Sequence, residues 1–252
     1  MEKGGANTAA SADGLKVLQA TPQCWKQKDF GEEGLFDTIL QIPFASAKDG
    51  AIRLKQLSVS HETIGGVIWD GTIVLAKYLE KKSEEGCNEL KGKRVLELGS
   101  GHSLLGIVSF LLGAREIVIT DYPQPSIMEL MQHNVDQNLK GKDLSNLSIC
   151  PLIWGEKDMI DAAKPNYDVI LAAELLYDEE TIEPLLQTIA ELSDRDTKVY
   201  MTHQEHGSKA SALFLQKVGD HFETVRHIPL SEQHPSFKAE NVGFTLLTHK
   251  RL

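Results

Sequence analysis

The fold is decided by Arg94-Val95-Leu96-Glu97-Leu98-Gly99-Ser100-Gly101, a run of apolar residues that ends in a glycine turn. The run is typical of a buried strand, and a helical pattern begins directly after the turn, near Leu104. A strand, a glycine turn and a helix in this order predict the nucleotide-binding unit of a doubly wound α/β sheet. Glycines let a ligand approach the backbone, and the helix offers its N-terminal N–H groups. Gly106 comes later than the third glycine of the dinucleotide fingerprint.

Two acidic residues narrow the choice of ligand for this unit. Asp121 follows the next strand, about twenty residues after Gly101, and this spacing suits hydrogen bonds to ribose hydroxyls. Glu97 precedes Gly99 closely, where its negative charge would oppose the pyrophosphate of a dinucleotide. S-adenosylmethionine has no phosphate and carries an ammonium and a sulfonium, so the pattern favours this methyl donor over NAD. The alternative is that the glycines only form a tight turn and Asp121 only caps the next element.

The rest of the chain alternates short apolar strand candidates with helical segments, which predicts a mostly parallel sheet with helices on both faces. The last two candidates have no helical pattern between them, so we expect an antiparallel pair at the sheet edge. One of the helices is predicted to begin at Ser126, where Ser126-Ile127-Met128-Glu129 has the spacing of a capping box. The seven predicted strands are Val95–Leu98, Ile117–Thr120, Leu147–Leu152, Val169–Ala173, Val199–Thr202, Thr224–Leu230 and Val242–His249.

The segment before this sheet is predicted to contain a tail, a hairpin and a helix. Residues 1–20 are rich in Gly, Ala and Ser and are expected to form a disordered tail, with residues 21–252 as a single domain. Leu35–Phe44 and Ala51–Val59 are strand-like and flank an Asp-Gly pair, which predicts a β-hairpin. From Trp69 onward apolar residues recur at helical spacing, so a helix precedes the main sheet.

The composition bears on partners and compartment. The 252 residues include 36 acidic and 26 basic ones, and the net charge of -10 repels a nucleic-acid backbone and attracts a basic protein segment. The three cysteines form no C-x-x-C pair, which argues against a disulfide framework or a thiolate zinc site and indicates a reducing compartment. Neither a leader nor an apolar membrane span is evident. We therefore expect a monomeric, cytoplasmic protein with no nucleic-acid or membrane partner.

Four motifs between residues 61 and 252 are distinctive in combination: Gly66-Val67-Ile68-Trp69-Asp70, Val95–Gly101, Trp154-Gly155-Glu156 and Ala173-Glu174-Leu175-Leu176-Tyr177. They resemble motifs of the non-histone protein-lysine methyltransferases, which include the valosin-containing-protein lysine methyltransferase and its Hsp70-directed relatives. The resemblance implies a Rossmann-like α/β fold of seven strands, mostly parallel with an antiparallel C-terminal strand. It also implies a protein substrate, with a chaperone or an AAA ATPase as its expected type.

The resemblance assigns roles to individual residues. Glu174 and Tyr177 match the acidic-x-x-aromatic motif at the end of the fourth strand, with Glu where many relatives have Asp, and would act on the acceptor. S-adenosylmethionine would leave as S-adenosylhomocysteine. Together with Glu97, the residues expected to bind the methyl donor are Trp69, Gly99, Ser100, Gly101, Asp121, Trp154 and Ala173. Trp69 and Trp154 could instead be core aromatic residues, and Glu174 could be structural.

Methyl transfer to lysine is an in-line displacement, so the protein has mainly to orient the amine and remove water. A lysine ammonium has no lone pair and must first lose a proton. Glu174 and the Tyr177 hydroxyl could align the amine and stabilise its developing charge, and bulk water could take the proton. The pattern leaves open whether Glu174 also acts as a base.

Other functions remain possible at this point. Methyltransferases that act on nucleic-acid amines commonly have two prolines where Leu175-Leu176 stand, which favours a protein acceptor here. A small-molecule amine as acceptor, or a non-catalytic binding protein that keeps the cofactor fold, is a further alternative. No metal is expected, because His203-Gln204-Glu205-His206 lacks the H-E-x-x-H spacing. His102, inside the glycine turn, is expected to affect only the packing of that loop.

Overall fold

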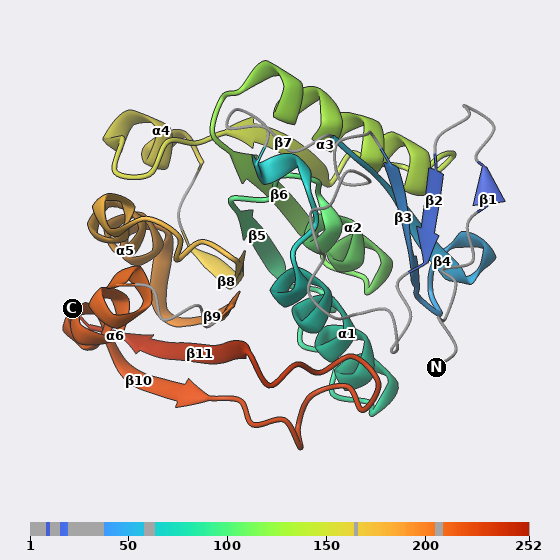
Figure 1. The fold of residues 1–252 in the computed structure, drawn as a ribbon. Helices are drawn as coiled ribbons and strands as arrows, with labels where there is room; N and C mark the ends of the chain where they lie inside the picture. Colours follow the sequence, from blue (N-terminus) through green and yellow to red (C-terminus); the bar gives the residue numbers. More distant parts are fainter. Residues whose placement is uncertain are drawn as a thin grey trace.

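The computed structural model describes residues 9–10, 16–19, 38–57, 64–163, 166–204 and 209–251. Its main sheet has seven strands in the order β10-β11-β9-β8-β5-β6-β7 (Figure 1). All pairs from β7 to β9 are parallel, and β11 runs antiparallel to both β9 and β10. The predicted α/β class, sheet and antiparallel edge are thus confirmed. The strands are β5 (Arg94–Leu98), β6 (Glu116–Asp121), β7 (Leu147–Pro151), β8 (Tyr167–Ala173), β9 (Ser193–Gln204), β10 (Phe222–His227) and β11 (Val242–Lys250).

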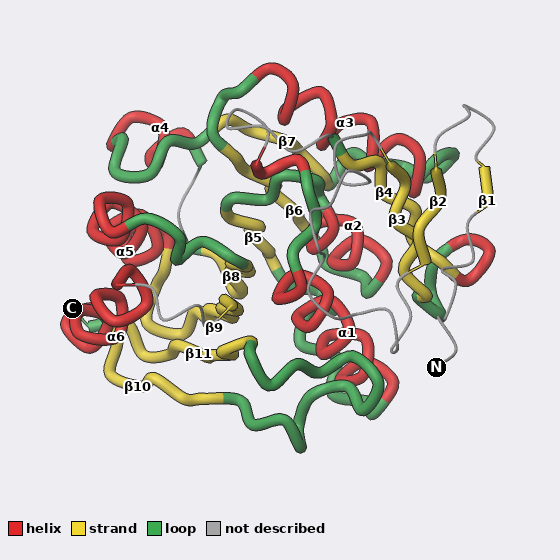
Figure 2. The backbone as a smooth tube through the Cα atoms, viewed as in Figure 1, coloured by secondary structure: helices red, strands yellow, loops and turns green. Residues whose placement is uncertain are grey.

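Helices cover both faces of this sheet, as Figures 1 and 2 show. One face carries α1 (Asp70–Glu84), α2 (Leu104–Leu111) and α3 (Pro125–Asn138). The opposite face carries α4 (Lys157–Ala162), α5 (Ile182–Leu192) and α6 (Lys209–His221). None of the helices in the described ranges is long and apolar enough to cross a membrane.

The sheet separates two hydrophobic cores, and its strands contribute to both by alternation. Val95 and Ile117 are buried against α1 to α3, whereas Leu96 and Val118, the next residues of the same strands, are buried in the opposite core. Successive side chains of a strand point to opposite faces, so a strand covered on both sides must be apolar throughout. Each such side chain contributes about 1.5–3 kcal/mol when fully buried.

The order of the strands sets the position of the ligand crevice. From β5 the chain moves outward to β6 and β7, and then returns to the other side of β5 to form β8. In open α/β sheets ligands bind at such a reversal, outside the carboxyl ends of the strands. Leu98 of β5 pairs with Ala172 of β8, so Gly99 and Ala173 lie next to each other at this edge of the sheet. The glycine turn and the Glu174 motif are brought together by this register.

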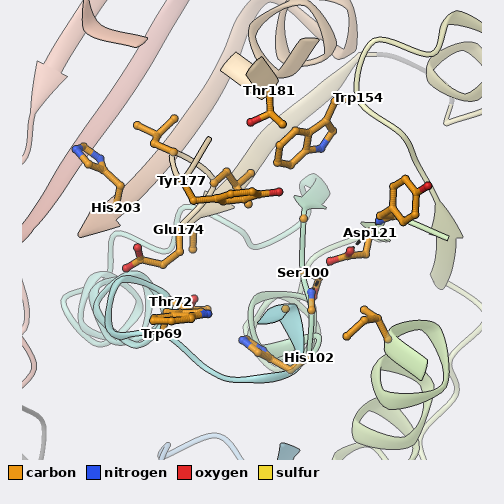
Figure 3. A pocket seen from close by; sticks show the side chains of 18 of the residues that line it. Trp69, Thr72, Ser100, His102, Asp121, Trp154, Glu174, Tyr177, Thr181 and His203 are labelled. Atoms are coloured by element: carbon orange, nitrogen blue, oxygen red, sulfur yellow. Dashed lines mark hydrogen bonds between the residues drawn. The ribbon is translucent and has the colours of Figure 1, made fainter. Parts of the chain in front are cut away.

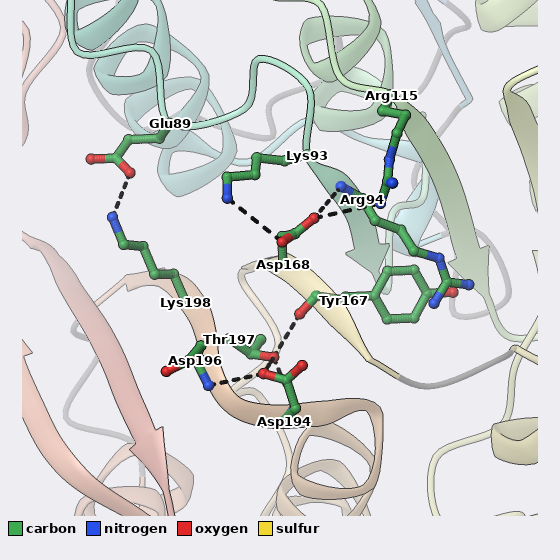
Figure 4. Close-up of polar contacts among 10 residues, drawn as sticks. All are labelled: Glu89, Lys93, Arg94, Arg115, Tyr167, Asp168, Asp194, Asp196, Thr197 and Lys198. Atoms are coloured by element: carbon green, nitrogen blue, oxygen red, sulfur yellow. Dashed lines mark hydrogen bonds and ion pairs between the residues drawn. The ribbon is translucent and has the colours of Figure 1, made fainter.

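The polar contacts in Figure 4 include a group around the first residues of β5 and β8. The Asp168 carboxylate accepts a hydrogen bond from the backbone N–H of Arg94 at 2.7 Å. It also lies 3.6 Å from the Lys93 ammonium and 3.9 Å from the Arg115 guanidinium. Exposed ion pairs of this kind contribute at most about 1 kcal/mol each. The backbone contact ties β8 to the start of β5, at the opposite end of these strands from the crevice.

The N-terminal sheet has four strands, β1 (Ala9–Ala10), β2 (Lys16–Gln19), β3 (Thr38–Pro43) and β4 (Ala51–Gln56). β3 and β4 pair antiparallel, as predicted for the hairpin, and Asp49 and Gly50 adopt the left-handed φ values of 56° and 70° in the turn. Residues 35–37 and 58–59 of the predicted strands lie outside the described residues. β1 and β2 fall inside the expected tail, and β2 pairs in parallel with β3. The remaining residues of that tail lie outside the described ranges.

The predicted capping box at the start of α3 is wrong. The helix begins at Pro125, its N-cap is Gln124, and no side chain caps it. Ser126 is therefore inside the helix, and its hydroxyl is buried without a hydrogen-bond partner. Proline is favoured at the first helical position because its φ is already helical and its missing N–H would be unpaired there. The helix therefore begins at Pro125, one residue before the predicted start at Ser126.

Two asparagines of α3 hold the outer edge of β4 as a neighbouring strand would. The Asn138 side chain accepts from the Arg53 N–H at 2.8 Å and donates to the Arg53 carbonyl at 2.7 Å. Asn134, one turn earlier, does the same for Lys55 at 2.8 and 3.1 Å. It also donates to the carbonyl of His102 in the glycine turn at 3.2 Å. The exposed edge of the hairpin is thus satisfied, and the hairpin is linked to the crevice.

Substitution of Asn134 should therefore destabilise the whole chain. Asn134→Ala leaves the N–H and carbonyl of Lys55 and the carbonyl of His102 without this partner, and we expect the free energy of unfolding to fall by about 1–3 kcal/mol. Urea titration measures the change. Gln132→Ala, on the exposed side of the same helix, is the control and should cost a few tenths of a kcal/mol, about the value of an exposed helical pair. Equal losses of unfolding free energy in the two variants would contradict the conclusion that Asn134 stabilises the edge of β4.

Candidate functional site

A cavity of about 740 Å³ opens at the carboxyl ends of β5, β6 and β8. Its size is in the range of sites for small organic ligands. Nine of the ten predicted site residues line it, and Glu97 does not. They are Trp69, Gly99, Ser100, Gly101, Asp121, Trp154, Ala173, Glu174 and Tyr177. Residues from distant parts of the sequence thus converge as the resemblance implied (Figure 3).

The glycine turn is shaped by a close approach of two backbone segments. Gly99 and Gly101 have φ values of 62° and 65°, which residues with a Cβ rarely adopt. A Cβ on Gly101 would overlap the carbonyl oxygen of Gly65, in the short 3-10 helix Ile64–Gly66. One wall of the cavity is therefore backbone packed against backbone. Glycine is required at Gly101 for space as well as for conformation.

Asp121 fixes this turn to the end of β6. Its Oδ2 accepts a hydrogen bond from the N–H of Gly101 at 2.6 Å, and its Oδ1 accepts from the N–H of Tyr122 at 2.7 Å. Burial raises the pKa of Asp121 to about 6, although both hydrogen bonds act in the other direction. Each carboxylate oxygen keeps a further acceptor position. The side chain can therefore hold the turn and accept hydrogen bonds from a ligand in the cavity.

Glu97 lies beneath the turn and does not line the cavity, and its binding of a cofactor stays a prediction. Its side chain is 1% exposed. The carboxylate accepts hydrogen bonds from the N–H groups of Leu105 at 3.1 Å and of Gly106 at 2.7 Å, in the first turn of α2. A Cβ on Gly106 would overlap Ile119 and approach the Glu97 carboxylate, so a glycine is needed here for helix and strand to pack closely.

This position of Glu97 has a consequence for the kind of ligand. The N-terminal N–H groups of a helix after a glycine turn are the groups that bind phosphate in dinucleotide folds. Here two of them are already paired with a carboxylate that belongs to the protein. A pyrophosphate would therefore meet donors that a side chain of the protein already occupies. The site is thus adapted to a ligand without phosphate.

Glu174 joins three elements at one end of the cavity. Its backbone has a φ of 61°, and strain of this kind persists at functional sites when the surroundings hold it. Its Oε1 accepts from the N–H of Gly71 in α1 at 2.7 Å, and its Oε2 accepts from the N–H of Gln204 in β9 at 2.9 Å. Burial raises its pKa to about 7, and the nearby Asp70 carboxylate acts in the same direction. Glu174 is thus held rigidly while it lines the cavity.

Aromatic side chains surround the opening. Trp69 is the residue immediately before α1, and Trp154 follows β7. The rings of Trp154 and Tyr177 lie 6.3 Å apart between centroids, within the usual range for aromatic pairs. Tyr177 is 65% exposed, so its ring and hydroxyl are accessible from outside the cavity. Both tryptophans face the cavity, which makes the alternative of purely core aromatics incorrect.

Sequence reasoning missed several lining residues. Gly65, Tyr122, Thr181 and His203 line the cavity, and so does His102, which we had expected to affect only loop packing. Tyr122 could have been found, because it follows Asp121 at the end of a strand. His203 belongs to the run that was considered for a metal, and its relevance comes instead from the position of β9 beside β8. The residues after Gln204 in that run lie outside the described part of the chain, whose residues contain no group of three or more potential metal ligands.

Comparison with known proteins adds the family. A family model described as lysine methyltransferase matches residues 48–221, more than half of the chain. The chain belongs to this lysine methyltransferase family. The matched range contains the glycine turn, Asp121, Trp154 and the Glu174 motif. Membership of the family agrees with the resemblance seen in the sequence motifs.

Relatives in this family are named as protein methyltransferases. Protein N-lysine methyltransferase METTL21A of Danio rerio is 40% identical over 140 residues, which cover 55% of this chain and 60% of that protein. Protein N-terminal and lysine N-methyltransferase EFM7 of Candida glabrata is 30% identical over 193 residues and 73% of both chains. The chain spans about three fifths of the METTL21A proteins of three vertebrates, with coverage of 60% to 62%.

Among solved structures, the ribosomal protein L11 methylase of Lactobacillus delbrueckii subsp. bulgaricus superposes with a TM-score of 0.51. The superposition covers 94% of both chains at 14% sequence identity. Identity this low supports a common fold and no more. The seven-stranded methyltransferase architecture is thus found in proteins of very different sequence.

The buried Glu97 carboxyl should make stability depend on pH. Burial raises its pKa from 4.5 to about 8, against the effect of its hydrogen bonds. The folded chain therefore keeps this proton to higher pH than the unfolded chain, and stability falls as pH rises from about 4.5 to about 8, by at most about 1.4 kcal/mol per pH unit. Glu97→Gln should be less stable at pH 5 and show a shallower decline, measured by urea unfolding at pH 5, 6, 7 and 8. The decline in stability that remains in Glu97→Gln comes from Asp121 and Glu174, because burial raises their pKa values as well.

The matched control is Glu129→Gln, an exposed position on α3. Its stability curve should run parallel to that of the unmodified chain. A Glu97→Gln curve that is also parallel would contradict the buried, protonated state of Glu97.

Proposed function

We propose that the chain is an S-adenosylmethionine-dependent protein-lysine N-methyltransferase that acts on a non-histone protein. Family membership supports the reaction class. The observation that carries the proposal is the Glu97 carboxyl group at the amino end of α2, which occupies two of the N–H donors that would bind a ligand phosphate. Among the described residues, the cavity lining includes Asp121, Glu174 and Glu180 but neither Lys nor Arg. Such a lining favours a ligand with an ammonium and a sulfonium group.

The methyl donor fits the half of the cavity next to the glycine turn. Asp121 would accept hydrogen bonds from the ribose hydroxyls, and the Trp154 ring would supply apolar surface for adenine. The backbone of Gly99, Ser100 and Gly101 would lie against the amino-acid part of the donor. When bound, the donor supplies an electrophilic methyl group. The residues of the chain orient it and exclude water.

The other half of the cavity suits the acceptor amine. Glu174 is fixed by the N–H groups of Gly71 and Gln204, so its negative charge needs little reorganisation when positive charge develops on nitrogen. The Tyr177 hydroxyl would orient the amine from the exposed side. Leu175 and Leu176, both buried, would help to desolvate a lysine chain and so favour its neutral form. Glu174 and Tyr177 are therefore the proposed catalytic pair.

The nature of the acceptor is part of the proposal. The motif resemblance supports a chaperone or an AAA ATPase. One relative at 30% identity, from Xenopus tropicalis, is named EEF1A lysine methyltransferase 3, which adds EEF1A as a candidate acceptor. We further propose a monomer in the cytoplasm, with residues 21–252 as one domain. The shared core of the hairpin and the main sheet supports the single domain, since Ile42 and Ile52 pack in the same cluster as Val95.

Labelling of a cell extract tests the function directly. The chain is incubated with heated extract and S-adenosylmethionine that carries a tritiated methyl group, and each sample is then divided between protease and nuclease. We expect the label to survive nuclease and to be lost with protease, because the acceptor is a protein side chain. Mass spectrometry should place the added methyl groups on lysine.

The other outcomes separate the alternatives. Label that survives protease and is lost with nuclease would make the chain a nucleic-acid methyltransferase. Label confined to the small-molecule fraction would indicate a small amine as acceptor. Binding of S-adenosylhomocysteine by calorimetry without labelling of any fraction would support a non-catalytic binding protein.

A further inference from the structure

Every backbone N–H group from Ser100 to Gly106 already donates a hydrogen bond within the protein. Their acceptors, in chain order, are the Thr120 carbonyl, Asp121 Oδ2, the Ser100 carbonyl, Ser100 Oγ, His102 Nδ1 and, for the last two, the Glu97 carboxyl group. Such N–H groups at the amino end of a helix ordinarily bind an anionic group of a ligand. These residues of the turn and of α2 therefore offer a negatively charged group no unpaired backbone donor.

The methyl donor nevertheless has one negatively charged group, the carboxylate of its methionine part. A carboxylate that leaves water needs a hydrogen-bond donor, because an unpaired charge is costly to bury. The carboxyl groups of Asp121, Glu174 and Glu180 face the same cavity and would repel it when they are ionised. Among the described residues of the cavity wall there is neither Lys nor Arg to offset this repulsion. The donor for the ligand carboxylate must therefore be another polar side chain near the glycine turn.

Three residues of the turn have side chains that could donate, and two of them are already used. The Ser100 hydroxyl bonds to the Glu97 carboxyl group and accepts from the N–H of Ser103 at 2.7 Å. The Ser103 hydroxyl donates to the carbonyl of Met131 at 3.3 Å. His102 is the third, and it lines the cavity although it is only 2% exposed. The imidazole of His102 is thus the side chain of the turn that can serve a ligand.

The orientation of this ring is set by contacts with two helices. Its Nδ1 accepts from the N–H of Leu104 at 3.4 Å, so the neutral ring carries its proton on Nε2. The His102 carbonyl accepts from the Asn134 side chain at 3.2 Å, which holds the backbone from the side of α3. Figure 3 shows the ring between Trp69 and Ser100. The Nε2–H group is therefore the donor that His102 can present on this wall of the cavity.

We propose that His102 binds the carboxylate of the methionine part of S-adenosylmethionine through Nε2–H, an assignment that rests on the proposed function. Asp121 would hold the ribose and Trp154 the adenine, so each polar part of the donor has its own partner. A hydrogen bond to a charged acceptor is stronger than one between neutral groups, above all away from water. Fixing the donor at both ends keeps its methyl group in one position, as an in-line displacement requires.

Comparison of S-adenosylmethionine with its decarboxylated form tests this contact, because the two ligands differ only in the carboxylate. Both are titrated by calorimetry at neutral pH into the unmodified chain and into His102→Asn. Asparagine keeps an acceptor for the N–H of Leu104 and has no group at the place of Nε2. We expect the affinity for S-adenosylmethionine to fall about 10–100-fold, the range for loss of a hydrogen bond to a charged group. The affinity for the decarboxylated ligand should fall by no more than about twofold, because that ligand never makes this bond.

Two controls show whether the effect is specific for the carboxylate. Asp121→Ala should weaken both ligands by the same factor, since both carry the ribose. His133→Asn, at an exposed position of α3, should bind both ligands as the unmodified chain does. His102→Gln, which has an amide N–H at the end of a longer side chain, should recover part of the affinity for S-adenosylmethionine. His102→Ala is measured in parallel, so that the comparison does not depend on the folding of one variant, and urea unfolding checks each of them.

Each result supports or overturns a distinct statement. A loss confined to S-adenosylmethionine in the His102 variants supports the proposed contact. Folded His102 variants that lose affinity for both ligands equally, or for neither, overturn the contact and leave the proposed function intact. An unmodified chain that binds neither ligand refutes the proposed function, and the contact with it.

Discussion

The hydrogen bonds between the Glu97 carboxylate and the N-terminal N–H groups of α2 are the interaction on which the site depends. They satisfy two donors that every helix leaves unpaired, and they do so from the strand that precedes the glycine turn. The strand, the turn and the helix are thereby held as one unit. Because these donors are no longer available to a phosphate, the same contact that stabilises the loop also disfavours a ligand that would bind this helix through a phosphate. The Glu97 hydrogen bonds therefore contribute both to the structure of the loop and to the choice of ligand.

The N-terminal sheet is built into this unit. Asn134 connects the edge of β4 with the carbonyl of His102, and the carbonyl of Gly65 lies where a Cβ on Gly101 would have to be. The segment before α1 is tied to β4 as well, since the Gln56 side chain accepts from the N–H of Ile68 at 3.0 Å. Movement of the hairpin would therefore disturb the glycine turn. This explains why a short sheet outside the main fold contributes to the wall of the cavity.

Local patterns predicted the main sheet because its strands are buried on both faces and so appear as short apolar runs. They also predicted which residues meet at the crevice, since parallel strands end at one edge. Three features could not be derived in this way. The contact of Glu97 with the first turn of α2 depends on close packing of Gly106 against Ile119, which belong to different elements. The Asn134 contacts join segments far apart in sequence, and the nearness of His203 to Glu174 follows from strand register, which a single strand does not reveal.

Calorimetric titration of the unmodified chain with S-adenosylhomocysteine and, separately, with NAD⁺ tests most directly whether the Glu97 contact selects the ligand. Asp121→Ala serves as the reference for a lost contact inside the cavity. We expect S-adenosylhomocysteine to bind at one site, with a loss of about 1–3 kcal/mol in Asp121→Ala, the usual cost of an unsatisfied hydrogen-bonding group. NAD⁺ should give no heat of binding at millimolar concentration, since its pyrophosphate finds the helix donors occupied. NAD⁺ binding as tight as that of S-adenosylhomocysteine, or equal affinity in Asp121→Ala, would contradict this account.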